Sequence, residues 1–155
     1  MPLPLDVDAV THSVQLAVAP VFFLTAVAGM ITAVAGRLAR IIDRARVLEE
    51  KIRTATDPAV TERHLVELGS LRTRGRIANA SIGFLALCGV MIGFTIVALF
   101  VGQTGGASWS RIAVACFLTG VGSFLVALIG FLCETILATQ LLNFKVLEMG
   151  REFRR

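Results

Sequence analysis

Long apolar runs, separated by polar segments, dominate the sequence. There are three such runs, at residues 9–36, 77–110 and 112–133, and none of them contains Asp, Glu, Lys or Arg. Because a helix rises about 1.5 Å per residue, roughly 20 apolar residues are enough to cross a hydrocarbon core of about 30 Å. The pattern therefore predicts an all-α integral membrane protein with three transmembrane helices. The spans are expected at about residues 13–36, 77–101 and 112–136.

The polar segment between the first two runs has a helical pattern of its own. Apolar residues recur there at alternating intervals of three and four, as in a heptad repeat. The stripe consists of Leu38, Ile41, Ala45, Leu48 and Ile52, and its counterpart further along consists of Leu65, Leu68 and Leu71. Between them, Asp57 can cap a second helix and Pro58 suits its first turn. We therefore expect a cytoplasmic helical hairpin over residues 37–76.

The remaining segments are short. Residues 102–110 are expected to form a flexible external connector, and residues 137–155 an amphipathic cytoplasmic tail helix that contacts lipid or a partner. The residues before the first run include Asp6 and Asp8 but no Lys or Arg, so we interpret this run as a retained span rather than a cleavable signal peptide. Spans and hairpin leave no room for a catalytic domain among 155 residues, and a single membrane domain over 1–155 is expected.

Basic residues are distributed very unequally, and this sets the expected orientation. Of the 15 Lys and Arg residues, all but Arg111 lie within 37–76 or in the tail. Cytoplasmic loops carry the excess of Lys and Arg. We therefore expect a multi-pass protein of the cytoplasmic (inner) membrane, with the N-terminus outside and the C-terminus in the cytoplasm. This topology explains the pI of about 9.6 without nucleic acid, for which no motif is visible.

Residues that commonly carry catalysis are few and badly placed for it. Cys88, Cys116 and Cys133 fall inside the predicted spans without metal-like spacing, and we interpret them as buried free thiols. His12 and His64 are expected on opposite sides of the membrane, so they cannot share a metal ion. No catalytic triad, P-loop or glycine-rich nucleotide motif is present. The sequence therefore predicts no enzyme, no cofactor and no metal site.

Small and hydroxyl residues form a stripe along each predicted span. Such stripes let helices approach closely in lipid, where no hydrophobic force drives helices together. Two interpretations remain open, namely helix packing within or between subunits and the lining of a narrow pathway. The residues concerned are Thr25, Gly29, Thr32 and Gly36 in the first span, Gly89 and Gly93 in the second, and Gly120, Ser123 and Gly130 in the third.

Each stripe ends in a polar residue at its expected cytoplasmic end. Together with arginines of the first junction, these residues form a candidate inner-mouth polar cluster of Glu134, Asp43, Asn79, Arg37, Arg40 and Arg44. Glu134 lies near the inner hydrocarbon boundary, where a carboxylate must pair, meet water or take up a proton. It is expected to pair with Arg37, Arg40 or Arg76, to serve as an ion or proton site, or to remain solvated.

Two further predictions concern the basic residues near the membrane boundary. Arg72, Arg74 and Arg76 precede the second span, and we interpret them as facing lipid, since each can gain about 1 kcal/mol from an anionic inner leaflet. A specific ligand site is the alternative. Arg40 and Asp43 are close neighbours on one helix and are predicted to be structurally coupled.

The junction after the first span carries a more specific signature. The run LAVAPVFFLTAVAGMITAVAGRLARIIDRAR has Pro20 near its start and the pattern RLxRIxDRxR from Arg37 to Arg46. It resembles the uncharacterised bacterial membrane family known as domain of unknown function 2721. The resemblance extends from about Gln15 to the last span. It implies a small multi-span membrane protein and supplies no catalytic residue.

Two classes of function are compatible with this architecture. A homo-oligomeric ion channel or pore would line its pathway with the stripes, and the charges at the inner mouth would set its selectivity. A non-conducting scaffold or accessory subunit would use the same stripes for packing, and its basic hairpin would bind lipid head groups or a cytoplasmic protein partner. The polar ends of the stripes favour the channel. Secondary transport is less well supported, because no inverted repeat is visible.

Overall fold

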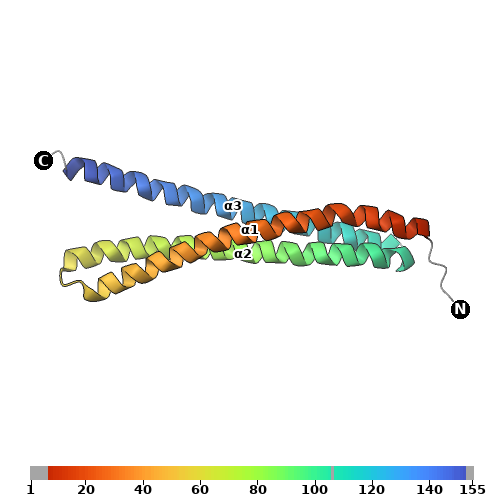
Figure 1. The fold of residues 1–155 in the computed structure, drawn as a ribbon, viewed down its shortest axis with the longest axis horizontal. Coiled ribbons are helices and arrows are strands. Elements are labelled where there is room, and N and C mark those ends of the chain that lie inside the picture. Colours follow the sequence, from red (N-terminus) through yellow and green to blue (C-terminus); the bar gives the residue numbers. More distant parts are fainter. Residues whose placement is uncertain (1–6, 106, 153–155) are drawn as a thin grey trace. The chain divides into compact units, whose positions relative to one another are not determined.

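The structure is a computed structural model that describes residues 7–105 and 107–152. Side chains are described for residue 11 and for residues 14–102 and 108–139. Three long helices make up this described part of the chain. The helices are α1 (Val7–Thr54), α2 (Pro58–Gly105) and α3 (Ala107–Glu152) (Figure 1). Each contains a stretch that is long and apolar enough to cross a membrane. The predicted all-α chain with three helices able to span a membrane is therefore confirmed.

Each helix is much longer than the span predicted inside it. α1 and α2 have 48 residues each and α3 has 46, so each measures about 70 Å at about 1.5 Å per residue. This is more than twice the thickness of a hydrocarbon core of about 30 Å. The predicted span borders at residues 36 and 76 are not helix breaks. Each helix must therefore continue beyond the hydrocarbon.

The predicted external connector differs from the structure. Residues 102–110 are expected to form a flexible loop, but α2 continues to Gly105 and α3 already begins at Ala107. The two helix ends pack closely, since a Cβ added to Gly102 would lie 3.4 Å from Trp109 Cβ.

At the other end of α3 the helix continues to Glu152. The apolar face predicted for the tail 137–155 falls mainly on residues after 139, outside the described side chains.

The first of two compact units contains residues up to Thr32 together with Gly83–Ala127. Its core combines large side chains of α2 with small residues of α3. A Cβ added to Gly120 would lie 3.1 Å from Ile92 Cδ1, so the missing side chain makes room for the isoleucine. Phe23 and Phe124 meet edge to face, with ring centroids 5.0 Å apart, a favourable aromatic geometry.

The second unit contains Ala33–Ile82 and the described residues from Leu128 onward. Here α1 and α2 pack as a hairpin around Ile41, Leu48, Leu68 and Leu71, with Ala45 and Ile52 against them. The helices meet at the short connection between Thr54 and Pro58 (Figure 1). Asp57 caps α2 as predicted, since Ala59 N donates to its Oδ1 at 2.9 Å. The cytoplasmic location of this hairpin stays a prediction.

α3 approaches α2 very closely in this second unit. A Cβ added to Gly130 would overlap with Ser81 Oγ. Ser81 is 2% exposed, and its hydroxyl donates to Ile77 O at 3.0 Å. The close approach at Gly130 brings the next turn of α3, which carries Glu134, against α1 and α2.

Candidate functional site

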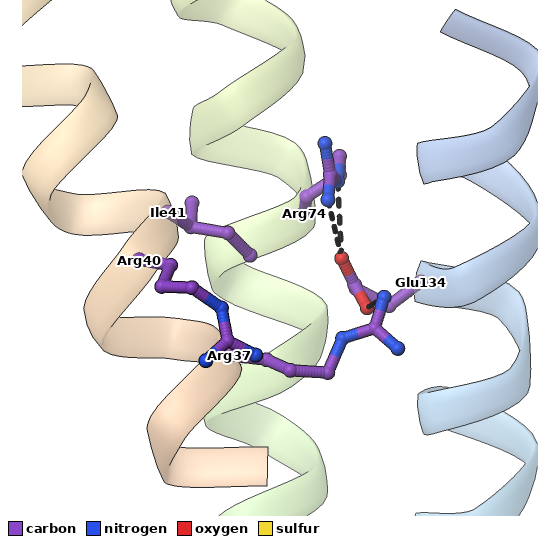
Figure 2. Close-up of a pocket in the computed structure, with 5 residues that line it drawn as sticks. All are labelled: Arg37, Arg40, Ile41, Arg74 and Glu134. Atoms are coloured by element: carbon purple, nitrogen blue, oxygen red, sulfur yellow. Dashed lines mark hydrogen bonds and ion pairs between the residues drawn. The ribbon is translucent and has the colours of Figure 1, made fainter. Parts of the chain in front are cut away.

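Glu134 of α3 is a buried charged residue, with 1% of its surface exposed. It lies in the second unit between Arg37 of α1 and Arg74 of α2 (Figure 2). Removing a carboxylate from water costs several kcal/mol unless it is paired and hydrogen-bonded. The two arginines, each from a different helix, supply that pairing.

Arg74 binds a single carboxylate oxygen through two nitrogen atoms. Its Nη2 and Nε donate to Glu134 Oε1 at 2.8 and 3.1 Å. The Arg74 side chain is 18% exposed, so water screens this contact less than it would a pair at the surface. Arg74 therefore joins α2 firmly to α3.

Arg37 is held against α3 by three contacts. Its Nη2 lies 2.7 Å from Glu134 Oε2, but without hydrogen-bond alignment, so among the described groups Oε2 is held by charge attraction alone. Its Nη1 donates to Thr135 Oγ1 at 3.0 Å. The guanidinium also lies over the Phe131 ring, 5.1 Å from the centroid, within the range of a cation–π contact. Together these contacts fix α1 to α3.

The burial of Glu134 follows from the repeat along α3. Seven-residue steps connect Ala113, Gly120, Ala127 and Glu134, and each of these residues is buried. Seven residues are almost two helical turns, so successive steps stay on one face of the helix. The last step places a carboxylate where the earlier steps place small apolar groups.

The same kind of repeat explains Arg74, which was predicted to face lipid with Arg72 and Arg76. Buried positions of α2 alternate at three and four residues, and those around this arginine are Leu71, Ala78, Ser81 and Leu85. Arg74 falls three residues after the first of these and four before the second, so its side chain points into the helix interface. Arg72 and Arg76 are exposed. The spacing of Arg74 from Leu71 and Ala78 was the signal in the sequence that could have identified it as an interface residue.

An open hollow of about 220 Å³ lies beside the ion pairs and is lined by Arg37, Arg40, Ile41, Arg74 and Glu134 (Figure 2). Three guanidinium groups face one carboxylate there, which leaves a formal surplus of two positive charges. Arg40 is exposed, and no ion pair or hydrogen bond to it occurs among the described side chains. The hollow can therefore attract an anion.

The remaining residues of the predicted inner-mouth cluster lie apart from Glu134. Arg44 pairs with Glu67, its Nη2 lying 2.8 Å from Oε1, while Asp43 and Asn79 are exposed. Glu134, Arg37 and Arg40 do come together. The predicted coupling of Arg40 with Asp43 is not seen as an ion pair between the described side chains.

The three small-residue stripes have different surroundings. On α3, Gly120 and Ser123 are buried and Gly130 is half-buried, so this stripe packs inside the chain. On α1, Thr25 and Thr32 are exposed. No described atom lies within 4 Å of a Cβ added to the stripe glycines of α1 and α2, which are Gly29, Gly36, Gly89 and Gly93.

The three cysteines also differ from one another. All are free thiols. Cys88 is buried as predicted, Cys116 is half-buried, and Cys133 is exposed. Exposure of Cys133 follows from its position on α3, because it precedes the inward-pointing Glu134 by one residue and a helix turns by about 100° per residue.

These features define a multi-pass α-helical membrane protein whose helices are joined by buried ion pairs. The chain belongs to the family described as "Protein of unknown function (DUF2721)", which it matches over residues 17–144. The resemblance drawn from the sequence is thereby confirmed. The match includes every residue of the Glu134 site. No curated protein and no solved structure matches the chain.

Proposed function

We propose that this membrane protein is a homo-oligomer that conducts ions along the face of α1 defined by Thr25, Gly29, Thr32 and Gly36. The observation that supports this proposal is the openness of that face. Both threonines are exposed, and no described atom would touch a Cβ added to either glycine. The comparable face of α3 is already filled by packing within the chain.

Helical periodicity supports a separate use for this face. Val27, Val34 and Ile41 are buried and succeed one another at seven-residue steps, which defines the packing side of α1. At about 100° per residue, the four stripe residues fall on the opposite side of the helix. In lipid, small and hydroxyl residues are the ones that allow close helix association. Further copies of the chain are the partners that this face suits.

Conduction rather than packing alone is supported by the hydroxyl groups. Thr32 Oγ1 donates its proton to Ala28 O at 3.0 Å, which leaves the lone pairs of this oxygen available to accept a hydrogen bond or coordinate an ion. Arg40 and Asp43, both exposed, follow the stripe at helical intervals. Charged rings at the end of a pathway set ion selectivity.

In the orientation that the basic residues favour, the N-terminus lies outside and the 37–76 hairpin and the C-terminus lie in the cytoplasm. The pathway would then open between Arg40 and Asp43 at the inner surface of the cytoplasmic membrane. Three helices of one chain do not enclose a pathway, so several copies are needed.

A non-conducting scaffold or accessory subunit is the second candidate. It is favoured by the Glu134 site, where the charge that could have served an ion or a proton is engaged by Arg37 and Arg74. In that case the open face of α1 serves packing alone. The exposed arginines of the hairpin, Arg72 and Arg76 among them, would meet lipid head groups or a cytoplasmic protein.

The deciding experiment measures ion flux into liposomes that contain the purified protein, under potassium, sodium, chloride and proton gradients, with oligomeric mass determined on the same sample. Gly29→Leu places a large side chain in the proposed pathway and is expected to reduce flux about tenfold or more. Gly122→Leu is the matched control, because Gly122 of α3 is exposed and equally free of described neighbours. A stable wild-type oligomer that passes no ion would favour the scaffold.

A further inference from the structure

The hollow beside Glu134 has more positive charge than the chain balances. Glu134 is the carboxylate among its lining residues, and both of its oxygens are engaged, Oε1 by Arg74 and Oε2 by Arg37. The nearest acidic residue along α1, Asp43, is exposed and forms no ion pair among the described side chains. The surplus of two charges therefore stays open to an external anion.

Each of the three arginines that line the hollow has at least one unused donor. Nη1 of Arg74 and Nε of Arg37 take part in none of the hydrogen bonds between described groups, which use their other nitrogens. Arg40 contributes its whole guanidinium from α1, one turn beyond Arg37 (Figure 2). The planar fork of a guanidinium fits phosphate and carboxylate oxygens in pairs. A phosphate group carries several oxygens around one centre and can accept from more than one such fork.

Size and depth agree with a phosphate group. The hollow of about 220 Å³ exceeds the volume of several water molecules at about 30 Å³ each. Arg37 directly follows the first uncharged run, and Glu134 directly follows the run 112–133. Residues at such borders lie at the level of lipid head groups, where phosphates are concentrated.

We propose that Arg37, Arg40 and Arg74 form a binding site for a phosphate group, carried by an anionic phospholipid or free in solution. Glu134 is a positioning residue, because it holds Arg37 and Arg74 in place and does not itself bind an anion. Arg40 is the cation that the ligand engages without first breaking an internal pair. The site stands whether or not the protein conducts ions.

The test measures binding in two arms. In the first, native mass spectrometry counts phosphatidylglycerol retained by protein released from nanodiscs of phosphatidylglycerol and phosphatidylcholine. In the second, the melting temperature in detergent is followed as sodium phosphate is added, with sodium chloride at equal ionic strength as the reference. Wild-type protein is expected to retain about one phosphatidylglycerol per chain, or to be stabilised by phosphate more than by chloride, and the arm that responds identifies the source of the phosphate group.

Arg40→Gln is the informative variant, because Arg40 has no internal partner among the described residues and its loss leaves the ion pairs of Glu134 intact. We expect about tenfold weaker binding, as for the loss of one charge-assisted contact, with an unchanged melting temperature in the absence of ligand. Arg46→Gln removes an exposed arginine of α1 outside the hollow and should leave binding unchanged. Equal weakening by both substitutions would show diffuse attraction and overturn the proposal, as would no response in either arm.

Discussion

At the scale of single residues, the buried carboxylate of Glu134 serves to join helices. Glu134 contacts arginines from two other helices, and Arg37 also reaches Thr135 and Phe131 on the same helix. A buried ion pair offsets its desolvation cost only when its remaining polar atoms are also satisfied. The second hydrogen bond of Arg74 and the Thr135 contact of Arg37 meet much of that requirement.

Replacing Glu134 by Gln should therefore destabilise the protein strongly. The substitution keeps the shape of the side chain but leaves two partly buried guanidinium groups without a counter-charge, which we expect to cost on the order of 2–4 kcal/mol. Glu49→Gln is the matched control, because the two side chains of its ion pair, Glu49 and Arg72, are 50% and 66% exposed and such pairs contribute about 1 kcal/mol or less. Melting temperatures in detergent measure both effects. Equal losses for the two variants would contradict a structural role for the Glu134 pairs.

At the scale of helices, the sequence was sufficient to place the main elements. Uncharged runs of spanning length identified the three apolar helices, and Asp57 with Pro58 identified the start of α2, because capping and chain rigidity act within a few neighbouring residues. The heptad-like stripe likewise identified the packed face of the hairpin, including Ile41 and Leu48. Local rules of this kind need no knowledge of the partner helix.

Contacts between helices were harder to predict. Arg72, Arg74 and Arg76 are alike in composition and in distance from the second span, yet Arg74 alone of the three reaches Glu134. The choice depends on how α2 is rotated against α3, which packing along the whole interface determines. The segment around Gly102 was also predicted incorrectly. The residues next to it in the sequence favour a loop, but α2 and α3 extend into this segment, where Gly102 packs against Trp109.

The close approach of α2 and α3 at Gly130 leads to a prediction about packing. Gly130→Ala would push a Cβ against Ser81 Oγ, and we expect a loss of about 1–3 kcal/mol, typical of overpacking. Adding Ser81→Ala removes the obstructing oxygen and should restore part of the loss. Gly122→Ala is the control, since nothing described lies within 4 Å of the added Cβ and alanine favours a helix by about 0.5–1 kcal/mol. A stable single Gly130→Ala variant would show that the Ser81 hydroxyl turns away, or that the helices separate, at little cost.

At the scale of the whole molecule, most of the exposed large apolar side chains lie in the uncharged runs, although Val47 and Val66 of the hairpin are exposed as well. Phe22 is 72% exposed, Leu118 64% and Ile129 61%, values that would promote aggregation in water. Contact with lipid removes that penalty, because hydrocarbon chains solvate these side chains as well as a protein core does. The charged residues instead occupy the helix portions beyond the apolar runs, so each long helix is divided between two surroundings.

The direction in which the helices cross the membrane can be tested by cysteine labelling. In a variant whose native cysteines are replaced by alanine, Ser108→Cys and Thr56→Cys each introduce one thiol at an exposed position. The excess of Lys and Arg between residues 37 and 76 favours retention of that segment in the cytoplasm. A maleimide that does not cross membranes should therefore label Ser108→Cys in intact cells, and Thr56→Cys only after permeabilisation. The reverse pattern would invert the topology and move both the phosphate site and the Arg40–Asp43 end of the proposed pathway to the outer surface.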